Sequence, residues 1–144
     1  NRLHFLEWCS YFQRAATKLL QGEGGLEEGM EEVGDALAGL NKRVRTLMTK
    51  SKKVFLGEQA HVTRAWEEAR LPATLSVLGG KGVLHMCSGL LLVPCARHGS
   101  IVGSARALRA SAAMANGVCN LLWVLLCSPA GAAVLASHTE AFDA

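Results

Sequence analysis

Hydrophobic residues recur at helical spacing through the first half of the chain, most regularly in residues 26–56. There the apolar positions alternate steps of four and three residues, with one polar interruption: Leu26, Met30, Val33, Leu37, Leu40, Val44, Leu47, Ser51 and Val54. A repeat of this kind, sustained over about four heptads, is typical of a helix that buries one stripe against other helices. The pattern therefore predicts a long helix over 26–56 that needs a helical partner.

Two shorter segments beside this repeat also have a hydrophobic side and a polar side. Residues 2–20 gather four aromatic side chains on one side, and the glycine-rich residues 21–25 end the pattern. That aromatic side suits either a partner helix or the surface of a bilayer. Residues 58–70 resume the helical pattern before a proline ends it. We predict that these helices and the helix over 26–56 form a water-soluble helical arm, residues 1–72.

The second half of the chain is nearly free of charge. Residues 1–72 hold 21 of the 27 charged residues, and the stretch from Gly82 to Thr139 holds only three. An ordinary chain is about one quarter charged, and a helix needs about 20 apolar residues to cross a bilayer. We therefore predict that residues 73–144 form a membrane-embedded helical hairpin, with spans over 80–102 and 110–133 and a short tail. The alternative is a soluble helical bundle that buries an unusually apolar hairpin.

The predicted fold class is thus all-α, with amphipathic and heptad helices followed by a membrane-embedded hairpin. The long helix also sorts its charges, because acidic residues occupy its first half and basic residues its second half. This order complements the helix dipole and permits antiparallel pairing with a similar helix. The net charge of +3, with both signs mixed in the first half, argues against a nucleic-acid partner.

Few residues of the second half could carry chemistry. His85 is an ionisable residue inside an apolar run, and Ser88 follows one helical turn later on the same side. Two interpretations of His85 stay open: a neutral side chain satisfied by a neighbouring polar group, or a role near a quinone or haem. Asn116 and Asn120 share one side of the second predicted span, where we expect interhelical hydrogen bonds.

No soluble-enzyme motif, metal site or disulfide framework is expected. The glycine-rich residues 79–82 lack the preceding strand and the hydroxyl residue of a phosphate-binding loop. The cysteines are odd in number, and four of them form two pairs spaced eight residues apart, which does not suit a metal: Cys9, Cys87, Cys95, Cys119 and Cys127. We expect them to be small buried hydrophobic side chains, and we expect no catalytic residue in this chain.

Two short motifs resemble a known family. Leu84-His85-Met86-Cys87-Ser88-Gly89 resembles the His-Arg-x-Ser/Thr-Gly element that opens the first membrane helix of the cytochrome b anchor subunit of succinate dehydrogenase, respiratory complex II. Asn116-Gly117-Val118-Cys119-Asn120-Leu121-Leu122-Trp123 resembles the Asn-Gly-Ile-Arg-His-Leu-x-Trp stretch late in that family's second helix. The two motifs occur in the family's order.

The resemblance implies a divergent membrane-anchor subunit of complex II in the mitochondrial inner membrane. Such a subunit holds the catalytic subunits at the lipid bilayer and lines a ubiquinone site, with His85, Ser88 and Trp123 in the quinone and haem vicinity. No ligand for haem b is implied, because the family's ligating histidine falls on Ala113. A second hypothesis belongs to another class: a non-catalytic accessory or scaffold membrane protein that acts through a coiled-coil-like arm.

Overall fold

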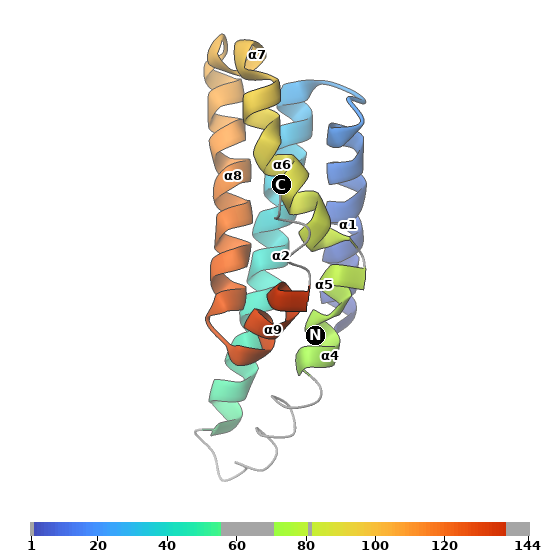
Figure 1. The fold of residues 1–144 in the computed structure, drawn as a ribbon, viewed down its shortest axis with the longest axis vertical. Coiled ribbons are helices and arrows are strands. Elements are labelled where there is room, and N and C mark those ends of the chain that lie inside the picture. The colour runs from blue at the N-terminus through green and yellow to red at the C-terminus, as the bar shows by residue number, and fades with distance from the viewer. Residues whose placement is uncertain (1, 56–70, 81, 138–144) are drawn as a thin grey trace.

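The computed structural model describes residues 2–55, 71–80 and 82–137. These residues form helices and turns without a strand, which confirms the predicted all-α class (Figure 1). The helix predicted over 58–70 lies outside the described residues. The helices are α1 (Arg2–Leu20), α2 (Leu26–Phe55), α4 (Leu71–Leu75), α5 (Val77–Gly80), α6 (Val83–Ala96), α7 (His98–Val102), α8 (Ala105–Leu126) and α9 (Pro129–Ser137).

Four of these helices, α1, α2, α6 and α8, form an elongated bundle (Figure 1). They surround the core in the order α1, α2, α8, α6, because α2 and α6 each pack on both α1 and α8. The helices α2 and α8 run in the same direction, whereas α1 and α6 run in the opposite direction. The short helices α4 and α5 lead into α6, α7 joins α6 to α8, and α9 folds back on α8.

The most extensive helix interface joins α2 to α8. The heptad stripe of α2 is buried there and against α1: Met30, Val33, Leu37, Leu40, Val44 and Leu47. The two helices approach each other closely at Gly117, where an added Cβ atom would lie 2.9 Å from the Cβ atom of Leu37. The helix expected in a soluble arm therefore packs along the helix expected in a bilayer, and both helices contribute to one core.

The first predicted membrane span is not one continuous helix. Residues 80–102 contain the end of α5, all of α6 and all of α7. Gly82 precedes α6 with a left-handed φ of 73°, which glycine adopts without strain, and Arg97 leaves helical geometry between α6 and α7. The prediction of a single helix over 80–102 is wrong because apolar composition does not reveal these backbone breaks. The second predicted span is also divided, since α8 ends at Leu126 and α9 begins at Pro129.

Within the described residues, α8 is the one helix long and apolar enough to cross a membrane by itself. The segments Leu71–Gly79 and Val83–Ala96 are long and apolar enough to cross a membrane only when they are taken together as one span. That span would be bent by 47° at their junction. About 44% of the most apolar 18-residue stretch of α8 is buried inside the bundle. Core helices of soluble proteins share this length and composition, so the membrane-embedded hairpin stays a prediction.

Candidate functional surfaces around α8

The helix α8 buries one side in the bundle and exposes two outer sides, which adjoin each other because Asn116 and Trp123 are two helical turns apart. Its first turn is capped by Ser104, whose Oγ accepts a hydrogen bond from the Ala107 backbone N–H at 3.2 Å. The buried side carries Met114, Val118, Leu121 and Leu125. The two outer sides differ in chemistry: one carries Leu108, Cys119, Trp123 and Leu126, and the other carries Arg109, Ala113, Asn116 and Asn120.

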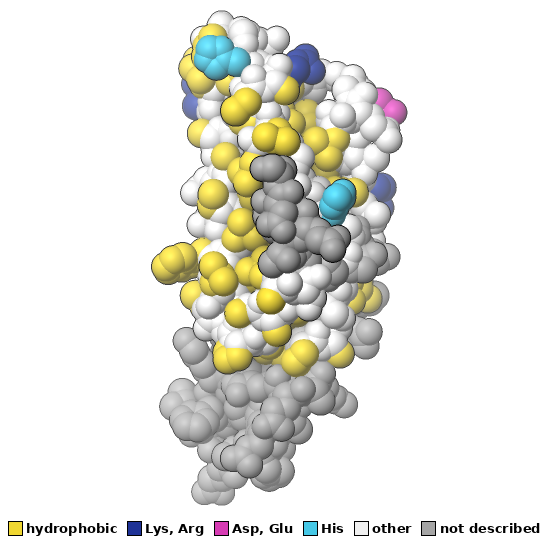
Figure 2. Space-filling view, in the orientation of Figure 1, with side chains coloured by type: hydrophobic (Ala, Val, Ile, Leu, Met, Phe, Trp, Pro, Cys, Tyr) yellow, Lys and Arg dark blue, Asp and Glu magenta, His cyan; other side chains and the backbone are white. Residues whose placement is uncertain are grey.

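The first outer side belongs to a larger apolar surface. Seven large hydrophobic side chains are exposed among the described residues, and all except Leu20 lie on α6, α7 or α8: Leu91, Leu92, Val102, Leu108, Trp123 and Leu126. We call these six residues the apolar face. Hydrophobic side chains spread over this side of the bundle in Figure 2, with charged side chains only toward its edges. No charged residue occurs within α6, or in α8 after Arg109.

Three cysteines also lie on exposed sides of the helices. Cys9 and Cys87 are buried as expected, and burial raises the pKa of the Cys87 thiol to about 12. The expectation of burial is wrong for Cys95, Cys119 and Cys127, which are exposed. Their sequence neighbours are apolar because the side of α6 and α8 that carries the apolar face is itself hydrophobic. Low polarity in the sequence therefore does not show that a cysteine is buried.

The three residues that sequence reasoning placed near a quinone lie on two helices. His85 is exposed on α6, and the Ser88 hydroxyl donates a hydrogen bond to the His85 backbone carbonyl at 2.9 Å. Trp123 lies on α8 with 70% of its surface exposed. The structure therefore keeps His85 and Ser88 together on the outer side of α6, and the hydrogen bonds and ring contacts of the described residues do not join Trp123 to them.

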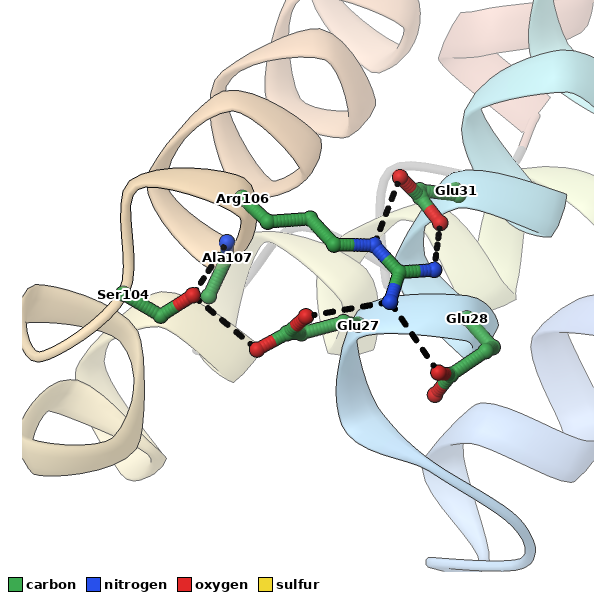
Figure 3. Close-up of polar contacts among 6 residues, drawn as sticks. All are labelled: Glu27, Glu28, Glu31, Ser104, Arg106 and Ala107. Carbon is green, nitrogen blue, oxygen red and sulfur yellow. Dashed lines mark hydrogen bonds and ion pairs between the residues drawn. The ribbon is translucent and has the colours of Figure 1, made fainter.

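An ionic cluster holds the beginnings of α2 and α8 together (Figure 3). Arg106 forms ion pairs with Glu27 at 3.3 Å and Glu28 at 3.2 Å, and it donates two hydrogen bonds to Glu31. Ser104 donates to Glu27 at 3.0 Å. Since α2 and α8 run in the same direction, the three carboxylates lie beside two helix amino-terminal ends, where negative charge is favourable.

This cluster shifts the ionisation of its members. The hydrogen bond from Arg106 lowers the pKa of the Glu31 carboxyl below its usual range, and the charges of Arg106 and Arg109 act in the same direction. The hydrogen bond to Glu31 and the charges of the three carboxylates raise the pKa of the Arg106 guanidinium. Both partners therefore stay charged at neutral pH. Their side chains are exposed, so solvent screens the attraction.

The second outer side of α8 forms a polar groove with α2. The groove has a volume of about 690 Å³, and small residues line much of it: Gly34, Ala38, Ala110, Ala113 and Gly117. Charged and amide side chains complete the lining: Glu31, Asp35, Asn41, Arg45, Arg109, Asn116 and Asn120. Asn41 of α2 also donates a hydrogen bond from its Nδ2 to the Gly117 carbonyl of α8 at 3.0 Å.

The sequence did not predict which side chain of this groove makes the hydrogen bond between α2 and α8. Sequence reasoning assigned interhelical hydrogen bonding to Asn116 and Asn120, whereas the structure places these two at the groove surface and gives the bond to buried Asn41. The pairing of Arg106 with α2 was also missed. A signal existed, because acidic residues begin α2 and arginines begin α8, and two such segments attract each other when they run in the same direction.

Comparison with known proteins identifies no family, since no protein-family model, curated protein or solved structure matches this chain. Ala113, which stands where the resembled family has its haem-ligating histidine, lies in the lining of the polar groove between α2 and α8. Within residues 2–55, 71–80 and 82–137, no three metal-binding side chains of His, Cys, Asp or Glu are grouped together.

Proposed function

We propose that this chain is a non-catalytic helical protein that attaches to a membrane through the apolar face. The observation that carries the proposal is the clustering of the exposed large hydrophobic side chains, six of seven of which lie on α6, α7 and α8. Large hydrophobic side chains exposed together on neighbouring helices are typical of a surface that binds a partner or a lipid. The absence of charge within α6, and in α8 after Arg109, favours lipid.

The geometry favours attachment from one side over complete insertion of the bundle. The exposed side of α2 carries Glu31, Asp35, Lys42 and Arg45, and α2 packs along α8. Moving α8 to the centre of a bilayer with α2 attached would bring these charges into hydrocarbon, at a cost of about 2.5–3.5 kcal/mol each on insertion scales. With the apolar face at the membrane surface, the charges stay in water, and Trp123 meets the interface that tryptophan prefers.

A membrane anchor of a respiratory complex is a specific form of this proposal. Its support is the resemblance of two motifs, together with the exposure of His85 and Trp123 on the two helices that carry most of the apolar face. Purification of the native assembly tests it, because flavin and iron-sulfur subunits with quinone-reductase activity are expected to co-purify. A scaffold protein would co-purify with other partners and would lack that activity.

Vesicle flotation tests membrane attachment directly. The double variant Leu92→Glu with Leu126→Glu places two charges on the apolar face at positions that are 59% and 61% exposed, so the bundle is expected to fold normally. Burying a leucine contributes about 1.5–3 kcal/mol, and the variant should therefore bind phospholipid vesicles at least about 10-fold more weakly.

The matched control adds the same two charges elsewhere on the bundle. Gln13→Glu with Gln21→Glu alters the surface of α1 and the turn that follows it. This control is expected to float with vesicles as the unmodified chain does. Equal flotation of both double variants, or no flotation of the unmodified chain, would show that the apolar face is not a membrane-binding surface.

A further inference from the structure

The outer side of α2 carries a second heptad pattern that faces away from the core. Residues 31, 35, 38, 42 and 45 follow one another in steps of four and three, and all five side chains are exposed. They are Glu31, Asp35, Ala38, Lys42 and Arg45. Four of them line the polar groove between α2 and α8. A helix that repeats heptads on two sides is suited to one set of contacts inside the bundle and another outside it.

Charge along this outer stripe changes sign at Ala38. Glu31 and Asp35 precede it by two turns and one turn, and Lys42 and Arg45 follow it by one turn and two turns. Arg109 of α8 lies at the acidic end and offsets part of its charge. The stripe is therefore a dipolar surface with opposite charges on either side of a small residue.

The floor of the groove is open because its central residues are small. Gly34 is informative, since a Cβ atom there would meet only ordinary contacts, 3.8 Å from the Met114 backbone nitrogen and 4.0 Å from the Ala113 Cβ atom. The bundle itself therefore has room for a methyl group at Gly34. A glycine in a helix interior costs about 0.5–1 kcal/mol relative to alanine. Its presence is explained if another helix must approach the surface closely at this point.

We infer that the groove between α2 and α8 binds a second copy of this chain. In the complex the two α2 helices lie antiparallel, and a two-fold axis passes beside Ala38. Glu31 then faces Arg45 of the partner subunit, and Asp35 faces Lys42 of the partner subunit. The two-fold axis repeats both pairs, so the same surface on the two copies forms four attractive contacts. Glu31 is able to pair with Arg45 of the partner subunit while it binds Arg106, because 44% of the Glu31 side chain stays exposed.

The second copy is favoured over an unrelated helix by this self-complementarity. The same five positions supply both the acidic half and the basic half, at matching distances from Ala38. The dimer surface is centred on the outer stripe of α2, whereas the residues of the apolar face lie on α6, α7 and α8, so the two surfaces use different side chains. Because the contacts are exposed ion pairs, the dimer is expected to weaken as salt rises and the Debye length falls from about 8 Å to about 3 Å.

A charge-swap experiment tests the dimer by analytical ultracentrifugation of the full chain without lipid. The variants are Asp35→Lys and Lys42→Asp, each of which places like charges opposite one another in its own homodimer. Each variant is expected to raise the dimer dissociation constant about 10-fold or more, which corresponds to about 1.4 kcal/mol. An equimolar mixture of the two variants restores both attractive pairs across the interface, so the dimer is expected to return in the mixture.

Two further variants separate the dimer surface from general effects of charge or fold. Arg14→Asp reverses an exposed charge on α1 and should leave the dimer unchanged. Gly34→Leu fills the groove and should give a folded monomer, as judged by circular dichroism. The proposal is overturned if the unmodified chain is monomeric at its highest soluble concentration, if the single swaps dimerise normally, or if their mixture stays monomeric. A monomer that recruits a different helical protein would be one such result.

Discussion

Replacing Leu37 with alanine is expected to lower the free energy of unfolding by about 2–5 kcal/mol. The Leu37 side chain is completely buried in the heptad stripe of α2, at the place where α2 approaches Gly117 of α8 closely. Its truncation removes apolar contacts from both helices and leaves a cavity that a packed bundle fills only in part. Urea unfolding followed by circular dichroism measures the change.

The control for this prediction is the same substitution at an exposed position. Leu126→Ala removes an equal number of atoms from a side chain that is 61% exposed, and we expect a change within about 0.5 kcal/mol. The unfolding of both variants should remain a single transition, because one core joins α2 to α8. A small effect of Leu37→Ala, or two separate transitions, would contradict the packing of the two halves of the chain on each other.

Identical glycine substitutions on the two helices should change stability in opposite directions. At Gly117 an alanine Cβ atom would lie 2.9 Å from Leu37 Cβ and 3.1 Å from Leu37 Cδ1, so Gly117→Ala forces α2 and α8 apart. Overpacking of this kind costs about 1–3 kcal/mol. At Gly34 the nearest atoms are at 3.8 Å, and Gly34→Ala is expected to stabilise the monomer by about 0.5–1 kcal/mol through helix propensity.

Thermal and urea unfolding at low protein concentration measure both effects without a contribution from the dimer. A loss of stability in Gly117→Ala together with a gain in Gly34→Ala would confirm the close contact between Gly117 and Leu37 and the open space beside Gly34. Equal gains in both variants would show that Gly117 is not in close contact with Leu37, and that the helices are further apart than the structure describes.

The sequence predicts individual helices of this protein better than their packing. The heptad stripe of α2 predicted a long helix, because hydrophobic spacing follows directly from helical geometry. The same spacing does not identify the surface that covers the stripe, which here is α1 together with α8. The low charge of the second half of the chain predicts that this half lies in a lipid bilayer. The structure shows that such sequence also forms the core side of α8, with Met114, Val118 and Leu121 buried.

The candidate surfaces illustrate the same limit. Sequence reasoning selected His85 because an ionisable residue in an apolar run is unusual, and the structure places it at the exposed side of α6. It did not find the pairing of Arg106 with Glu27, Glu28 and Glu31, because residues about 75 positions apart meet only after α2 and α8 align. It did find the sorted charges of α2, which now define the proposed dimer surface.

The proposed attachment requires a bundle that keeps α8 on α2 while its apolar face binds a membrane. A disulfide between the two helices tests this arrangement. The Cβ atoms at positions 34 and 113 would be 4.0 Å apart, within the range of a disulfide. The chain for this experiment carries Gly34→Cys and Ala113→Cys, with the exposed Cys95, Cys119 and Cys127 replaced by serine. A non-reducing gel confirms that the bond forms within one chain.

Vesicle flotation of this chain before and after oxidation is the most direct measurement. We predict equal binding of the locked and the reduced forms, because the apolar face is already exposed in the packed bundle. If the reduced form floats and the locked form does not, α8 must leave α2 to enter the bilayer, and the chain binds membranes as an inserted hairpin instead of a packed bundle. If neither form floats, the apolar face does not attach this protein to membranes.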